Sequence, residues 1–125
     1  MDTRKKILTV EEALRLTGPL ALVTGYFDVL RAGHIRDLDV VVQEVGPGGS
    51  KLLVVVLPDA AEYLAQRARA ELVAALRMVD YVVPAGSGDA ARLAETLHCA
   101  PVVSLEQADR ERSRGLKEHI HGRQA

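Results

Sequence analysis

Residues 22–38 read "LVTGYFDVLRAGHIRDL" and join two apolar segments through a turn rich in glycine, acid, arginine and histidine. The apolar run that enters this turn, residues 20–25, is short and bounded by turn residues, which is typical of a strand covered on both faces. Beyond the turn, over residues 33–45, apolar side chains recur at the spacing of one helix face. The stretch therefore predicts a strand, a turn and a helix, the unit from which α/β sheets are built.

The same alternation continues along the whole chain. A short helix with Thr9 as N-cap and Glu12 at the capping-box spacing precedes the first strand. Further strands are predicted over residues 51–58, 80–85 and 100–105, and further helices over residues 61–79 (beginning near Ala65 or earlier), 86–98 and 109–125. Strands that alternate with helices predict an α/β fold, a Rossmann-like three-layer sandwich with a mostly parallel sheet of about four or five strands. Residues 1–125 are interpreted as a single domain.

Composition excludes several function classes. The formal net charge is −1 and only 3% of residues are aromatic, with no Trp, so neither an electrostatic field nor a stacking platform favours a nucleic-acid partner. No apolar run reaches the length of a signal peptide or a membrane span, so no membrane association is expected. The single Cys99 excludes a disulfide within the chain. We therefore expect a cytoplasmic protein.

The turn after the first strand has the chemistry of an anion site. Gly25 has no Cβ, so the backbone there can come close to a ligand. Gly33 and His34 open the following helix, where unpaired N–H groups and the positive end of the helix dipole favour phosphate. Asp28 either orients the turn or caps it, and the pattern alone favours capping. Asp59, after the second strand, is either a ligand of Mg²⁺ or ribose or the N-cap of the next helix.

Residues 25–34, "GYFDVLRAGH", resemble the Gly-x-Phe-Asp-x-x-His-x-Gly-His signature of the cytidylyltransferase-like nucleotidyltransferases. Residues 66–83, "QRARAELVAALRMVDYVV", are similar to a helix and strand of that family, with Arg69 at the position of its arginine. The lead-in "TRKKILTVEEALRL", residues 3–16, resembles the heptose-phosphate adenylyltransferase and glycerol-phosphate cytidylyltransferase branches. The matching positions of the signature are Gly25, Phe27, Asp28, Gly33 and His34.

The resemblance implies a reaction and a set of residues. A phosphate of a small phosphorylated sugar or polyol would attack the α-phosphate of CTP or ATP, usually with Mg²⁺, and release pyrophosphate. The catalytic residues that it implies are His34, which would contact the phosphates, Arg31, and Arg69, which would lie near the nucleotide or the phosphorylated substrate. The nucleotide- and phosphate-binding residues that it implies are Gly25, Tyr26, Phe27, Asp28, Gly33, Arg112 and Ser113. Because relatives often pair through helices near the site, a homodimer is also expected.

The chain departs from the family pattern at three places. Arg31 stands where the family has its first histidine, and it either enters the site as a permanently charged phosphate binder or points to solvent. The last third of the chain has nothing like the Lys-Gly-Gly-Asp-Tyr segment of the heptose branch. Residues 112–114 read Arg-Ser-Arg where the family has Ser-Thr-Thr.

Three hypotheses follow from the matches and the departures. The first is an active nucleotidyltransferase, which the intact Gly33, His34 and Arg69 favour. The second is a nucleotide-binding homologue with impaired turnover and a regulatory or assembly role, which Arg31 and the altered final motif favour. The third is a structural oligomer module.

Overall fold

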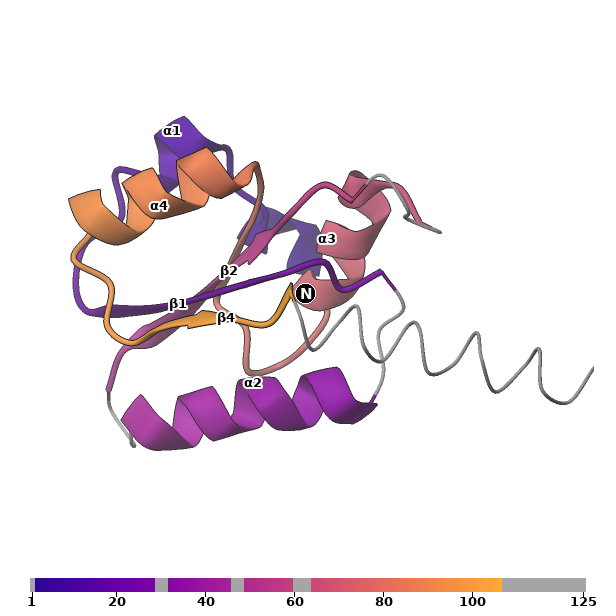
Figure 1. Cartoon of the computed structure of the whole chain (residues 1–125), viewed down its shortest axis with the longest axis horizontal. Coiled ribbons are helices and arrows are strands. Elements are labelled where there is room, and N and C mark those ends of the chain that lie inside the picture. Colours follow the sequence, from indigo (N-terminus) through magenta and orange to yellow (C-terminus); the bar gives the residue numbers. More distant parts are fainter. Residues whose placement is uncertain (1, 29–31, 46–48, 60–63, 107–125) are drawn as a thin grey trace, which may run out of the picture.

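The computed structural model describes residues 2–28, 32–45, 49–59 and 64–106. Its strands are β1 (Leu20–Gly25), β2 (Lys51–Val56), β3 (Tyr81–Pro84) and β4 (Val102–Ser104). They form one sheet in the order β3-β2-β1-β4, and every pair of neighbours is parallel (Figure 1). The predicted parallel α/β sheet is confirmed, with β1 at a position where it pairs with both β2 and β4.

The helices cover both faces of this sheet. They are η1 (Thr3–Lys6), α1 (Val10–Ala13), α2 (Ala32–Val45), α3 (Gln66–Ala74) and α4 (Ser87–Thr96). In Figure 1, α1 and α4 lie on one face and α2 on the other. Successive side chains of a strand point to opposite faces, so Leu22 of β1 packs in the cluster of α1 and α4, and Val23 packs in the cluster of α2 and α3. Every residue of β1 is buried, so the predicted strand covered on both faces is confirmed, and this burial explains its apolar sequence.

The capping box predicted for the first helix is confirmed by its two hydrogen bonds. The Thr9 hydroxyl accepts a hydrogen bond from the Glu12 N–H, and the Glu12 carboxylate accepts one from the Thr9 N–H, both at 3.1 Å. This reciprocal pair is the capping box. The 3₁₀ turn η1 in front of it was not predicted; the Asp2 side chain caps it by accepting from the Arg4 N–H.

Several element ends differ from their predicted positions. The helix predicted over residues 61–79 is α3, which ends at Ala74, because the next residues close tighter turns in which the N–H groups of Leu76 and Val79 bond three residues back. The second strand ends two residues before the predicted Pro58, whose nitrogen has no hydrogen to donate. The predicted helix over residues 109–125 lies outside the described residues.

The helix predicted over residues 86–98 is α4, which ends at Thr96, two residues before the predicted end. His98 is exposed and has a φ of 52°, the left-handed conformation common just after a helix. The neighbouring Cys99 is half-buried against the cluster of α1 and α4, and this burial raises the pKa of its thiol.

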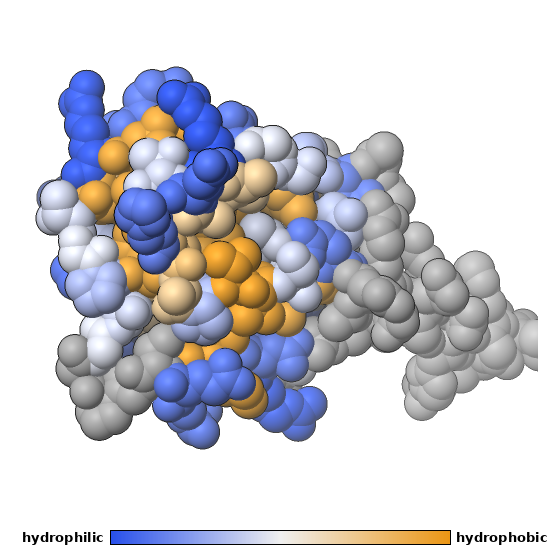
Figure 2. Space-filling view, turned by 60° about the vertical axis from the view of Figure 1, so that its left-hand side comes forward, coloured by the Kyte–Doolittle hydropathy of each residue, from blue (hydrophilic) through white to orange (hydrophobic). Residues whose placement is uncertain are grey.

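Hydrophobic side chains reach the surface, and on the face drawn in Figure 2 they gather in its middle part, between hydrophilic side chains. Among the described residues the large exposed hydrophobic side chains are Ile35, Val40, Leu64, Leu72 and Val102. No helix in the described ranges has the length and apolarity needed to span a membrane.

Candidate functional site

The strand order creates a topological switch point between β1 and β4. From β1 the chain passes through α2 to β2 on one side, whereas β4 arrives through α4 and pairs with β1 on its other side. The segments that leave the carboxyl ends of β1 and β4 are adjacent there, because the N–H of Leu105 donates to the Thr24 carbonyl at 2.8 Å. In open parallel sheets this crevice is where ligands bind.

Buried polar side chains gather at this edge. Among the described residues, the buried polar or charged ones are Thr24, Asp28, His34 and Arg69. Thr24 is the second-last residue of β1, and Asp28 follows that strand. His34 lies in the first turn of α2, and Arg69 reaches the same strand end from α3. A buried polar group is stabilised only when it is hydrogen-bonded, so their concentration at one strand end marks a specialised part of the molecule.

The turn after β1 has an unusual backbone at Phe27. This side chain is fully buried in the cluster of α2 and α3, whereas Tyr26 packs against the opposite cluster. Phe27 has a φ of 51°, a left-handed conformation that costs a residue with a Cβ about 1–2 kcal/mol. Such conformations persist where the surroundings impose them, and they cluster at binding and catalytic sites.

The first turn of α2 faces this loop. The helix begins at Ala32, one residue before the predicted Gly33, and His34 is its third residue. The His34 ring is 2% exposed, and its centroid lies 5.5 Å from that of Phe27, with the ring planes inclined by 49°. The backbone N–H groups of a first helical turn have no partner within the helix, and the positive end of the helix dipole lies there, so this end of α2 has the polarity that favours an anion.

The buried Arg69 side chain is hydrogen-bonded to the loop that follows β1. Its Nη1 donates to the carbonyl oxygens of Tyr26 at 2.6 Å and Leu57 at 2.7 Å, and its Nε donates to the Leu64 carbonyl at 3.0 Å. One guanidinium therefore connects the segments that follow β1 and β2 with the start of α3. The motif resemblance implied a contact with nucleotide or substrate; these bonds give Arg69 a positioning role that the resemblance did not imply.

Two further side chains strengthen the same connection. The Asp28 carboxylate accepts from the Leu64 N–H at 2.9 Å, which favours the orienting role for Asp28. On α3, one turn before Arg69, the Gln66 amide donates to the carbonyl of Val56 at 2.9 Å and to that of Ala85 at 3.4 Å. The first turn of α3 thus ties together the carboxyl ends of three strands.

The other predicted site residues are placed as follows. Gly25 is the buried last residue of β1, and Gly33 is half-buried in the first turn of α2. Arg31, Arg112 and Ser113 lie outside the described residues.

Of the two roles predicted for Asp59, a ligand of Mg²⁺ or ribose and the N-cap of the next helix, the structure tests the second. The next helix begins at Gln66 with Ala65 as its N-cap, so capping of that helix by Asp59 was a wrong alternative. Within the described ranges no three His, Cys, Asp or Glu side chains lie close enough to hold a metal ion.

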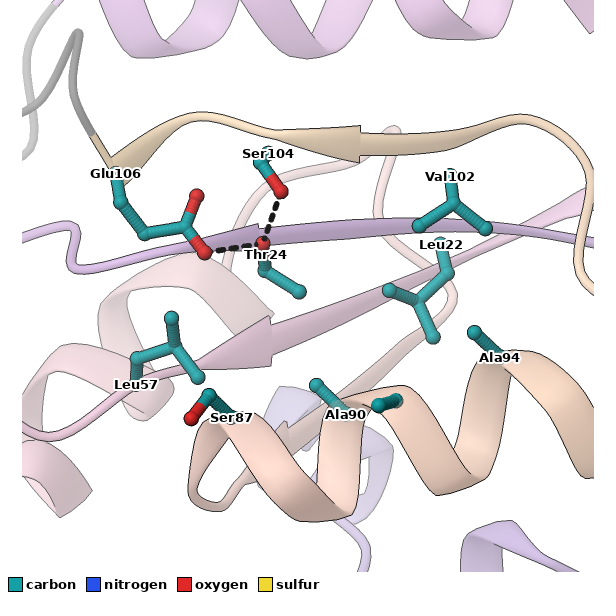
Figure 3. A pocket seen from close by; sticks show the side chains of 10 residues that line it. Leu22, Thr24, Leu57, Ser87, Ala90, Ala94, Val102, Ser104 and Glu106 are labelled. Carbon is teal, nitrogen blue, oxygen red and sulfur yellow. Dashed lines mark hydrogen bonds between the residues drawn. The ribbon is translucent and has the colours of Figure 1, made fainter.

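A pocket at the switch point was not predicted. It has a volume of about 240 Å³ and lies between the β1–β4 pair and α4 (Figure 3). Its polar residues are Thr24, Ser87, Ser104 and Glu106, and its apolar ones are Leu22, Leu57, Ala90, Ala91, Ala94 and Val102. The sequence signal for Glu106 was its position directly after the fourth strand, at the edge where a switch point places ligands.

Comparison with known proteins adds no further family information. Neither the models of protein families nor the curated proteins give a match to this chain.

Proposed function

We propose that this protein is a nucleotidyltransferase that transfers a cytidylyl or adenylyl group from CTP or ATP to a small phosphorylated sugar or polyol. The observation that carries the proposal is the concentration of the buried polar residues Asp28, His34 and Arg69, with Thr24, at the switch point of a parallel sheet. Asp28 and His34 also stand at matching positions of the signature described above, and Arg69 stands at the position of the family's arginine.

The site has the features that a polyphosphate requires. The first turn of α2 offers N–H groups and the positive end of the helix dipole. The guanidinium of Arg69 adds a permanent positive charge directly behind the Tyr26 carbonyl. Together they favour negative charge at the loop of residues 25–28, in a chain whose net charge of −1 provides no general attraction.

The reaction needs no covalent protein intermediate. An oxygen of the acceptor phosphate forms a bond to the α-phosphorus of the nucleotide, the bond from that phosphorus to the bridging oxygen breaks, and pyrophosphate leaves with the electron pair. His34 would donate a hydrogen bond to the phosphate oxygens on which charge increases. Preorganised donors of this kind account for about a hundred- to a thousandfold in rate each.

Mg²⁺ fits this site as a companion of the nucleotide. In nucleotide sites Mg²⁺ keeps several waters and binds substrate phosphates with only one or two carboxylates, so a single carboxylate from the protein would suffice. Asp59, half-buried just beyond β2, is the carboxylate that would hold it.

A nucleotide-binding protein without turnover is the second candidate. The observation in its favour is the burial of the two described catalytic candidates, since His34 is 2% exposed and Arg69 is fully buried. Under this proposal the same loop binds CTP or ATP for a regulatory or assembly role.

Binding and turnover are tested separately on the same preparation. Thermal melting with each nucleoside triphosphate and Mg²⁺ measures binding, because a ligand that binds only the folded state raises its melting temperature. Pyrophosphate release with a panel of sugar and polyol phosphates measures turnover. His34→Asn tests the site, and His98→Asn, a change of an exposed histidine at the end of α4, is the matched control.

The candidates predict different results. Under the first, CTP or ATP stabilises the protein, pyrophosphate is released, and His34→Asn but not His98→Asn lowers the rate about a hundredfold or more. Stabilisation without release supports the second candidate. The absence of stabilisation by any nucleotide contradicts both. Light scattering of the same preparation tests the homodimer that the resemblance implies.

A further inference from the structure

The pocket beside the switch point has a polar end and an apolar end. In the β1–β4 register Leu22 pairs with Val102 and Thr24 with Ser104, and all four line the pocket. The pocket therefore runs along this strand pair, with Leu22, Val102 and Ala94 at one end and Thr24, Ser104 and Glu106 at the other (Figure 3). The polar end is the one at the carboxyl ends of the strands, directly beside Gly25.

The polar end is organised around the Glu106 carboxylate. The Thr24 hydroxyl lies 2.6 Å from Oε1 of Glu106 and 3.3 Å from the hydroxyl of Ser104. A hydroxyl has one proton, and a carboxylate only accepts. The Thr24 proton is therefore directed to Glu106, so the Thr24–Ser104 bond has Ser104 as its donor.

This direction makes the polar end an acceptor surface. With the protons of Thr24 and Ser104 engaged, these groups present lone pairs, and Oε2 of Glu106 is buried with no hydrogen-bond partner among the described residues. A buried acceptor without a partner costs free energy that a ligand donor would recover. A phosphate, which is itself an anionic acceptor, is disfavoured here, whereas a ligand with hydroxyl donors is favoured.

Size and lining restrict the ligand further. A volume of about 240 Å³ is below the roughly 300–1,000 Å³ of pockets that enclose a whole drug-sized ligand. The α4 wall consists of Ser87 and of Ala90, Ala91 and Ala94, whose small side chains leave room for the flat side of a ring. The pocket thus accommodates one ring or a short polyol.

We propose that this pocket is a subsite for a vicinal diol and that Glu106, held in place by Thr24, accepts the hydrogen bonds of its hydroxyl groups. The proposal rests on the proposed function for the ligand that carries the diol. Two parts of the reaction contain one, the ribose of the nucleotide and the polyol chain of the acceptor.

The order of groups along the pocket favours the ribose. In a nucleotide the ribose lies between the phosphates and the base. In the protein the acceptor surface lies between the loop of residues 25–28 and the apolar end, which begins two residues, or roughly 7 Å, further back along β1. Phosphates at the loop, ribose at Glu106 and base edge against Leu22 and Ala94 would reproduce this order.

The test compares ligands that differ only in their hydroxyl groups. Dissociation constants are measured by calorimetry for CTP, ATP, their 2′,3′-dideoxy forms and glycerol 3-phosphate. The proteins are the wild type, Glu106→Gln, which keeps the shape of the side chain, and Thr24→Val, which removes the hydroxyl that holds it. Glu95→Gln, a neutralisation of an exposed carboxylate on α4 outside the pocket lining, is the matched control for charge.

The wild type should bind the ribonucleotides about tenfold or more tightly than the dideoxy forms, and both pocket variants should reduce this ratio towards one while Glu95→Gln preserves it. A loss of glycerol 3-phosphate affinity in the pocket variants, with the nucleotide ratio unchanged, assigns the diol to the acceptor and also supports the subsite. Variants that bind every ligand as the wild type does overturn the proposal.

If no nucleotide binds but glycerol 3-phosphate binding depends on Glu106, the proposed nucleotide function fails and the diol subsite stands. If neither kind of ligand binds the wild type, both fail.

Discussion

At the scale of single residues, Arg69 is the side chain on which most of the site geometry depends. Five N–H donors in a fixed plane allow one guanidinium to serve several carbonyl groups at once. Here three carbonyls from three separate segments converge on it, and the side chain is fully buried. Lysine has a single nitrogen on a flexible chain, so it cannot reproduce these hydrogen bonds to three carbonyl groups.

Removing the Arg69 side chain should therefore destabilise the fold strongly. Arg69→Ala would remove this donor from the part-buried carbonyls of Tyr26 and Leu64 and from the buried carbonyl of Leu57, and a buried acceptor that loses its partner costs about 1–3 kcal/mol. The variant would also leave a cavity where the fully buried side chain was. We expect a decrease in the free energy of unfolding of about 3 kcal/mol or more, measured by urea denaturation. Arg67→Ala on the same helix removes only an exposed ion pair with Glu71, so it should change stability by less than about 0.5 kcal/mol. Equal losses in both variants would contradict the positioning role.

Phe27 permits a test of backbone strain. Both Phe27→Ala and Phe27→Gly remove the same buried ring, with a cavity cost of about 3–5 kcal/mol. In ordinary backbone alanine is the more stable of the two, but at a φ of 51° only glycine is free of the Cβ clash. The glycine variant should therefore be at least as stable as the alanine variant, by up to about 1 kcal/mol. A clearly more stable alanine variant in urea denaturation would show that the turn is not strained.

At the scale of elements, the capping box couples the first helix to pH. The hydrogen bond from the Thr9 backbone to the Glu12 carboxylate holds the pKa of Glu12 below its ordinary value of 4.5. Since the folded state has the lower pKa, the ionised carboxylate contributes stability above pH 4.5, and this contribution is lost as the pH falls through the folded-state pKa. Glu12→Gln retains a capping acceptor without a charge. The melting temperatures of the wild type and of Glu12→Gln should therefore differ at pH 7 and converge as the pH falls through the folded-state pKa of Glu12; a difference independent of pH would contradict the assignment.

The elements also show what local sequence determines. Thr9 and Glu12 are three residues apart, and residues 25–34 form one continuous motif, so both were predictable from their own neighbourhood. The bond between Thr24 and Glu106 spans 82 residues, and that from Arg69 to Tyr26 spans 43. Contacts of this kind depend on the strand order, which periodicity does not specify, so the pocket and the positioning role of Arg69 became visible only in the folded chain. The end of α3 was misplaced for a related reason, because alanine-rich sequence favours helix beyond Ala74 while the connection to β3 requires a turn.

At the scale of the whole molecule, stability and ligand response should follow the sheet order. β1 pairs on both sides and is buried throughout, and β2 is buried from Leu52 onward, so their amide hydrogens should exchange most slowly with solvent. β4 is a strand of three residues with an exposed Val102, so its amides should exchange faster. Hydrogen exchange followed by NMR measures both.

The same measurement locates the nucleotide without prior choice of a site. A ligand at the switch point stabilises the backbone that surrounds it, so CTP or ATP with Mg²⁺ should slow exchange at Tyr26, Asp28 and the first turn of α2. The amino ends of the strands, at Leu20 and Lys51, lie at the opposite edge of the parallel sheet and should change only as much as global stability does. Protection confined to that amino edge would place the ligand away from the turn after β1 and contradict the proposed site. Protection at Tyr26 and Asp28 that disappears in His34→Asn would link the anion site to the histidine that follows it.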